Sequence, residues 1–233
     1  MIKFILTGES QTYSGNKLRF VLKIFGYGLL IHLLFTIINV LLSKYGLIEF
    51  KTHPTTDLIQ ATNSPLKLLV IGFLSVFLHP LMEELSFRLM LKPKGYNSVI
   101  GIGCCIAFLI LQFSQVYQLL PINQEVAFDL LFVVITGATA IMLIYYKSGK
   151  ERVNSIIEKN KALFILIANV LFGLIHIYVV SEPNYSILYI VLLLPYVLVG
   201  YLKTYALLKL GFVYAVLCHS LNNLFFVTLN LLF

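Results

Sequence analysis

The sequence predicts an all-α protein, a polytopic transmembrane helical bundle with about seven spans and a cytoplasmic N-terminus. Two observations support this fold class. The 233 residues are 59% hydrophobic and only 12% charged, which is about half the charged fraction of a soluble domain. Apolar runs long enough to cross a bilayer also follow one another along the chain. Since no long polar segment separates these runs, we expect one membrane-embedded domain over residues 1–233, and an integral, multi-pass protein.

Seven apolar runs have the length of about 20 residues that a spanning helix needs. Pro195 and Gly200 interrupt the sixth run. With seven spans the C-terminus lies outside, and an eighth span would bring it inside. The segment 147–161 is mixed in charge, and we expect it to be partly helical and to lie on the anionic inner leaflet. The seven runs cover approximately residues 22–43, 66–91, 97–120, 126–146, 162–180, 186–206 and 210–232.

The basic residues between the runs set the orientation. With the N-terminus inside, thirteen Lys and Arg residues lie in cytoplasmic segments and three lie outside, as the positive-inside rule requires. The net charge of +7 therefore predicts a lipid bilayer as the partner, and no nucleic acid. The inner residues are Lys3, Lys17, Arg19, Lys23, Lys92, Lys94, Lys147, Lys150, Arg152, Lys159, Lys161, Lys203 and Lys209, and the outer ones are Lys44, Lys51 and Lys67.

The second run carries three charged residues, Glu83, Glu84 and Arg88. Charge inside a membrane span costs about 2.5–3.5 kcal/mol per residue on insertion scales, so such residues usually have a function. Glu84 and Arg88 are four residues apart on one helical face, and we expect an ion pair between them. Glu83 points about 100° away and is a candidate general base facing a wet cavity. Pro80 is expected to kink or restart the helix, with His79 capping it rather than tuning Glu83.

The fifth and seventh runs contain further polar residues. His219 and Asn223 are four residues apart in the seventh run and share one helical face. In the fifth run, Phe172 lies one turn before His176, where its ring can pack against the imidazole. Gly173 would allow a neighbouring helix to approach closely. Any one of these polar residues alone could simply form hydrogen bonds between helices.

Depth in the membrane connects these residues with the carboxylate of the second run. Counted from the inner lysines at about 1.5 Å per residue, Glu83 is about 14 Å deep, His219 about 15 Å, Asn223 about 21 Å and His176 about 22 Å. All four fall near the middle of a hydrocarbon core about 30 Å thick. Together these four residues could promote the attack of a water molecule on a carbonyl carbon. Glu83 and His176 would activate the water, and His219 and Asn223 would donate hydrogen bonds to the oxyanion.

Three motifs in this order resemble the CPBP family of CAAX proteases and bacteriocin-processing enzymes. This family is also called the Abi family and includes the Rce1-like prenyl endopeptidases. The resemblance covers a motif-bearing core of about residues 66–232. The motifs are E-E-x-x-x-R at Glu83, Glu84 and Arg88, F-x-x-x-H at Phe172 and His176, and H-x-x-x-N at His219 and Asn223.

The resemblance implies an intramembrane endopeptidase that uses a glutamate and no metal or other cofactor. Glu83 and His176 would activate the water, and His219 and Asn223 would form the oxyanion hole. The substrate would be a membrane peptide or a lipid-modified peptide. The short loops look more like those of the bacterial branch, which is linked to peptide maturation, bacteriocin immunity and signalling, so we expect a bacterial cell membrane. The supporting residues would be Glu84, Arg88 and Phe172.

Two alternatives remain open from the sequence. Glu83, His176 and His219 are also a possible zinc set of two histidines and one carboxylate, with the fourth position open to water. No H-E-x-x-H motif is present, and the three ligands would come from three helices. The chain could also be a non-catalytic immunity or scaffold protein that binds a membrane peptide. A Glu83→Gln variant would discriminate between catalysis and such binding.

Overall fold

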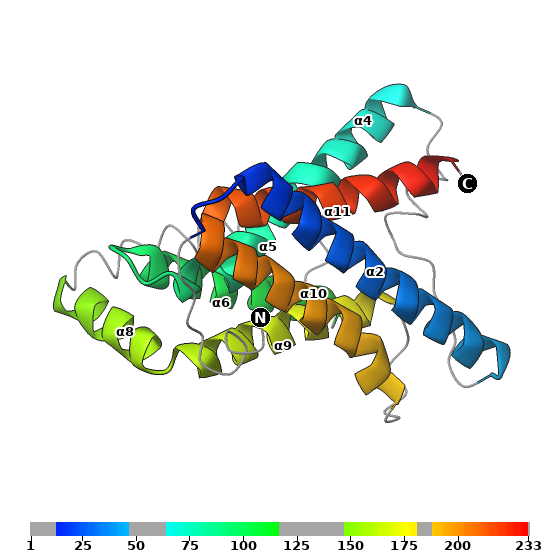
Figure 1. The fold of residues 1–233 in the computed structure, drawn as a ribbon. Helices are drawn as coiled ribbons and strands as arrows, with labels where there is room; N and C mark the ends of the chain where they lie inside the picture. The colour runs from blue at the N-terminus through cyan, green and yellow to red at the C-terminus, as the bar shows by residue number, and fades with distance from the viewer. Residues whose placement is uncertain (1–12, 47–63, 117–146, 181–187, 233) are drawn as a thin grey trace. The chain divides into compact units, whose positions relative to one another are not determined.

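The computed structural model describes residues 13–46, 64–116, 147–180 and 188–232, and over these ranges its regular structure is helical throughout (Figure 1). The all-α class predicted from the sequence is therefore confirmed. The predicted fourth span, 126–146, lies outside the described residues. The helices are α2 (Lys17–Lys44), α4 (Pro65–Phe73), the π-helical turn η1 (Leu74–Leu78), α5 (His79–Phe87), the 3₁₀ turn η2 (Leu89–Leu91), α6 (Asn97–Val116), α8 (Lys147–Lys159), α9 (Lys161–Val180), α10 (Leu188–Leu210) and α11 (Phe212–Leu232).

The described helices include four that are long and apolar enough to cross a membrane. Two shorter helical stretches, Asn97–Leu109 and Lys161–His176, are also apolar. Each of these six overlaps a run that the sequence predicts as a span, so the described chain is a helical membrane bundle. The four long candidates are Lys17–Lys44, Pro65–Phe87, Val191–Leu210 and Phe212–Leu229.

Contacts between Cα atoms divide the chain into two compact units. The described part of the first unit runs from residue 82 to 116 and from 147 to 168, and contains η2, α6 and α8. The second unit contains α2, α4, η1, α10 and α11. The division falls inside α5 and α9, each of which contributes residues to both units.

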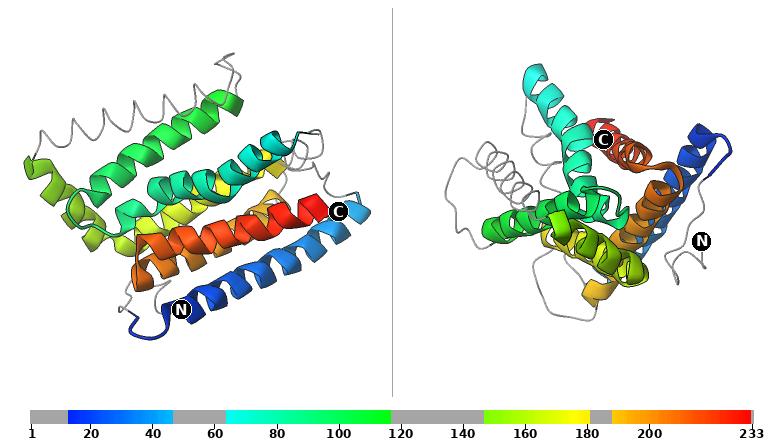
Figure 2. Two further views of the ribbon diagram at one scale, coloured as in Figure 1. Left: turned by 90° about the horizontal axis from the view of Figure 1, so that it is seen from above. Right: turned by 90° about the vertical axis from the view of Figure 1, so that its left-hand side faces the viewer.

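In the second unit, α2, α10 and α11 lie side by side (Figure 2). Gly211 makes the tight turn between α10 and α11, with its N–H donating to Leu207 O at 2.8 Å. Its φ of 109° is one that glycine adopts most readily. Gly28 brings α2 close to α11, because a Cβ there would lie 3.2 Å from Asn222 Nδ2. The buried apolar cluster between the three helices consists of Val21, Ile24, Leu202, Ala206 and Cys218.

The sixth predicted span is one unbroken helix. α10 continues from Leu188 to Leu210 through both Pro195 and Gly200, and the predicted sixth span is confirmed as a helix long and apolar enough to cross a membrane. Lys203, which the sequence analysis counted among the basic residues of the cytoplasmic side, is buried inside this helix at 4% exposure. The excess of basic residues in the inner segments does not depend on Lys203.

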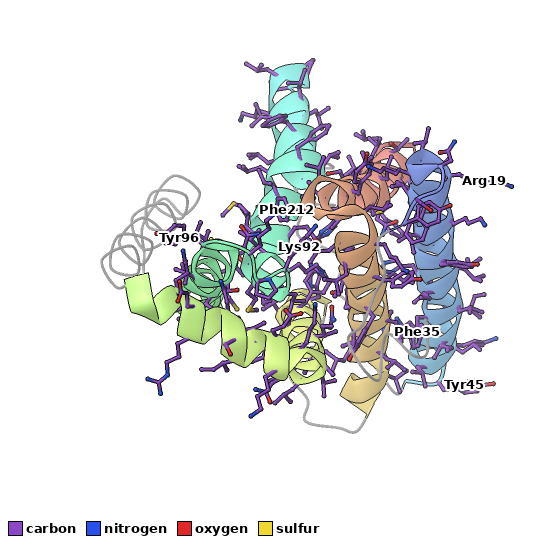
Figure 3. The ribbon with its side chains drawn as sticks, turned by 60° about the vertical axis from the view of Figure 1, so that its left-hand side comes forward. Arg19, Phe35, Tyr45, Lys92, Tyr96 and Phe212 are labelled. Atoms are coloured by element: carbon purple, nitrogen blue, oxygen red, sulfur yellow. The ribbon has the colours of Figure 1, made fainter. Side chains whose placement is uncertain are left out.

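In the first unit, α8 packs against α6 and the turn that precedes it. Gly95, with a φ of 60°, forms this turn, and its carbonyl accepts a hydrogen bond from Asn154 Nδ2 at 3.1 Å. The Lys150 ammonium lies 4.6 Å from the centre of the Tyr96 ring, and Figure 3 shows Tyr96 at this turn. The expected helix within the segment 147–161 is therefore confirmed.

Gly101 allows α6 to approach the backbone of η2 closely. A Cβ at this position of α6 would lie 2.9 Å from Met90 Cα in η2, so the backbone of Met90 would have to move. We expect Gly101→Ala to destabilise the protein by about 1–3 kcal/mol, as overpacking does. Thermal unfolding in detergent would measure the loss. The control is Gly26→Ala in α2, where a Cβ meets nothing within 4 Å and should stabilise by about 0.5–1 kcal/mol. Equal effects would contradict the prediction.

The second span changes its helical geometry before Pro80. The N–H of His79 donates to Leu74 O, five residues earlier, which makes Leu74–Leu78 a π-helical turn. Proline has no N–H and its ring clashes with the carbonyl four residues before it, and a widened turn accommodates both effects. His79 has φ −58° and ψ −50°, which are helical values. The helix therefore does not restart at Pro80, and the expected capping role of His79 is wrong.

Candidate active site

A buried ion pair occupies the end of α5. Arg88 Nη1 donates to Glu84 Oε1 at 2.8 Å, and both side chains are 0% exposed. The Arg88 N–H also donates to Glu84 O at 3.0 Å. The pair predicted from the i, i+4 spacing is thus confirmed. In an apolar environment each charge is tolerated because the other compensates it.

Contacts with α6 hold this part of α5 in place. The Ser86 hydroxyl donates to Met82 O at 2.8 Å and lies 3.3 Å from Cys104 O in α6. The rings of Phe87 and Phe108 meet edge to face, with centroids 5.6 Å apart. These contacts fix the rotation of this part of α5, from which the half-buried Glu83 projects.

In the second unit, Phe172 packs between two histidines. Its ring centroid lies 4.5 Å from that of His176 and 5.9 Å from that of His219. The contact predicted for Phe172 and His176 is therefore confirmed. Gly173 makes it possible for α10 to lie against this part of α9, since a Cβ there would be 2.7 Å from Leu193 Cδ1. The fifth and seventh predicted spans thus bring their histidines to one aromatic ring.

The ring of His176 is held from two sides. Its Nδ1 lies 2.7 Å from Phe172 O. A carbonyl oxygen can only accept, so this hydrogen bond places the proton on Nδ1 and makes Nε2 the nitrogen that can accept a proton. The ring of Tyr196 stacks on the imidazole, with centroids 4.7 Å apart and an interplanar angle of 25°. Both contacts restrict the rotation of His176.

Asn223 lies one turn after His219 on α11, as the sequence predicts. Asn223 Nδ2 donates to Ser75 O at 2.8 Å, and Ser75 belongs to the π-helical turn η1. His219 is buried, with 3% of its surface exposed. The amide of Asn223 therefore points toward the backbone of η1 through a contact that the sequence pattern did not indicate.

Two further residues of α10 contact this cluster and were missed by the sequence analysis. Tyr196 stacks on His176, and the Lys203 ammonium lies 4.8 Å from the centre of the Phe172 ring. A cation over an aromatic face is attracted by the ring. The available signal was a lysine near the end of the apolar run 186–206, but the same pattern occurs wherever a span ends at an inner loop. Its contact with Phe172 had to come from the structure.

The structure thus brings Phe172, His176 and His219 together and places Asn223 on the same helix as His219. Glu83 belongs to the first unit, and its approach to the histidines stays a prediction. The alternative zinc set draws its carboxylate from one unit and its imidazoles from the other, so it also stays a prediction. Within either unit, the described residues include no group of three His, Cys, Asp or Glu side chains that could hold a metal ion.

The fold and these residues define a class of protein: a multi-pass helical membrane protein with ionisable groups inside its spans. Residues 65–225 match a family model described as type II CAAX prenyl endopeptidase Rce1-like. The match covers more than half of the chain, and the chain belongs to this family of CAAX proteases. Membership gives a membrane protease as the general class of activity. No match was found among curated proteins or among solved structures.

Proposed function

We propose that this protein is an intramembrane endopeptidase that hydrolyses peptide bonds of membrane-associated peptides. The observation that carries the proposal is the family match over residues 65–225, because it includes all three motifs, from Glu83 to Asn223. The buried ion pair of Glu84 and Arg88 supports it. Burying charge inside a span is costly, and the residues that do so usually belong to a functional site.

In the proposed reaction, water attacks the carbonyl carbon of the scissile peptide bond. Glu83 accepts a proton from the water as the new C–O bond forms, and His176 holds the water in place. The negative charge that develops on the carbonyl oxygen is stabilised by hydrogen bonds from His219 and Asn223. Glu83 then gives its proton to the leaving nitrogen as the C–N bond breaks. The products are a carboxylic acid and an amine, and proton transfer between them gives a carboxylate and an ammonium group.

The hydrogen bond from His176 Nδ1 to Phe172 O suits this role. It leaves Nε2 as an acceptor, which can take a hydrogen bond from the water and direct the oxygen lone pair toward the substrate. Phe172 contacts both histidine rings and so supports their orientation. Glu84 and Arg88 support the site by fixing the helix that carries Glu83.

We propose a membrane peptide or a lipid-modified peptide as the substrate, because a site within the spans is reached from the bilayer. The short loops suit the bacterial branch of the family, and we place the protein in a bacterial cell membrane. Peptide maturation, bacteriocin immunity and signalling are the roles we consider for it there.

The test is hydrolysis of quenched fluorescent peptides by the purified protein in liposomes, with each peptide supplied in prenylated and unmodified form. Cleavage of either form supports the proposal, and mass spectrometry of the products locates the bond. We expect the rate to change less than twofold in excess chelator, because the proposed water is activated by a carboxylate. A loss of activity that added zinc restores would favour the zinc alternative. Absence of cleavage, with binding retained, would favour a non-catalytic immunity or scaffold role.

A further inference from the structure

The π-helical turn η1 leaves one backbone carbonyl without a partner from its own helix. His79 N–H donates to Leu74 O, so the backbone hydrogen bonds of the helix at this point join residues five apart instead of four. In that register the next carbonyl, that of Ser75, would accept from residue 80. Residue 80 is a buried proline, which has no N–H to donate. Ser75 is itself buried, at 8% exposure, and a buried carbonyl without a hydrogen bond is costly.

The side chain of Asn223 supplies the missing donor. Asn223 Nδ2 lies 2.8 Å from Ser75 O, a good distance for a hydrogen bond. Because a carbonyl can only accept, this contact also settles which end of the carboxamide is nitrogen. One of the two N–H groups on Nδ2 is directed at Ser75, and the planar amide therefore holds the second N–H in a fixed direction. The backbone of η1 thus orients a side chain of α11.

We infer that Pro80 is a positioning residue for the oxyanion donor Asn223, acting through the carbonyl of Ser75. The inference rests on the proposed function, in which the second N–H of Asn223 stabilises the oxyanion. By withholding an N–H, Pro80 keeps the Ser75 carbonyl available to the amide of Asn223. A donor held by a backbone group is preorganised for the charge that develops during the reaction.

The kinetic test is Pro80→Ala, assayed with the peptide that the wild-type protein cleaves. Alanine restores an N–H at residue 80, so the helix can satisfy Ser75 O by itself and release Asn223. We expect kcat to fall about 10- to 100-fold, as small misplacements of catalytic groups do, with KM changed less than twofold. In an Asn223→Ala background, Pro80→Ala should lower kcat less than threefold further. Pro80→Ser also supplies an N–H and should behave as Pro80→Ala does.

If Pro80 served only to stabilise the fold, Pro80→Ala would lose stability together with activity. The positioning role predicts a loss of activity without a loss of stability. Alanine favours helix far more than proline does, so Pro80→Ala should unfold at the same temperature as the wild type or a higher one while losing activity. The control is Phe77→Ala, in the same turn, whose side chain is 56% exposed and whose N–H is retained. Its kcat should stay within twofold of the wild type. Wild-type kcat in both Pro80 variants would overturn the inference.

A second measurement tests the link between Pro80 and Asn223 without any activity. Asn223→Ala should lower the apparent melting temperature by about 3–8 °C, because the Ser75 carbonyl loses its hydrogen bond. In the Pro80→Ala background, Asn223→Ala should lower the apparent melting temperature by less than half as much. An equal fall in melting temperature in both backgrounds would overturn the inference. If this coupling is found but the wild type cleaves no peptide, the positioning of Asn223 stands and the proposed function fails.

Discussion

Replacing Glu83 with glutamine is expected to reduce kcat for peptide hydrolysis by about 10³-fold, within the range that general acid–base catalysis contributes. Glutamine has nearly the size of glutamate and keeps an acceptor oxygen, but it cannot accept the proton that the attacking water must lose. The assay is cleavage of the fluorescent peptide in liposomes, at substrate concentrations above and below KM. Because the side chain keeps its shape, we expect KM to change less than kcat.

The matched control for this variant is Glu158→Gln. Glu158 lies on α8, is 61% exposed and pairs with Lys161 at 3.4 Å, and it has no part in the proposed reaction. Its activity should stay within twofold of the wild type. Comparable activity in Glu83→Gln and in the wild type would contradict catalysis by Glu83. A cellular phenotype that survives the Glu83 change would point to the non-catalytic role instead.

Replacing Arg88 with alanine is expected to destabilise the protein by about 3–5 kcal/mol, the usual cost of removing one partner from a buried ion pair. Glu84 is 0% exposed, and its carboxylate would lose the cation that compensates it. The total stability of a folded protein is commonly only about 5–15 kcal/mol, so much of the variant should be lost. The measurement is the yield of folded protein after membrane extraction, together with its apparent melting temperature.

A double variant separates the ion pair from packing. Glu84→Gln combined with Arg88→Met removes both charges and keeps similar volumes, and it should recover a large part of the stability lost in Arg88→Ala. The control is Lys161→Ala, which removes the partner of the exposed Glu158 and should cost about 0–1 kcal/mol. If Arg88→Ala were no more harmful than this surface change, the buried pair would not be the stabilising feature that its geometry indicates.

The sequence predicted those features that depend on local helical geometry. Spacings of four residues placed Glu84 beside Arg88 and Phe172 beside His176, because i and i+4 share a face on any helix. Gly173 was expected to admit a neighbouring helix, and in the structure α10 lies against it. Span length and charge distribution likewise predicted the membrane helices and the helix at 147–159.

The features that the sequence analysis missed depend on contacts between distant segments. The hydrogen bond from Asn223 to Ser75 joins residues 148 positions apart, and no local pattern specifies it. Lys203 was counted only as an orientation signal, and its packing against Phe172 within α10 was not predicted. Pro80 was expected to kink or restart the helix of the second span, but the chain accommodates its missing N–H in a widened turn. In each case tertiary contacts offset a local penalty.

The one-residue turn at Gly211 has a consequence for how the protein enters the membrane. The connection is too short for α10 and α11 to enter the membrane independently of each other. We therefore expect the two helices to insert together as a helical hairpin. Inserted alone, each helix would expose polar side chains to hydrocarbon, Lys203 on one and His219 with Asn222 on the other. Lys203 and His219 contact Phe172 of α9, and Asn222 lies against Gly28 of α2, so we expect the hairpin to be fully shielded from lipid only after α9 and α2 have packed against it.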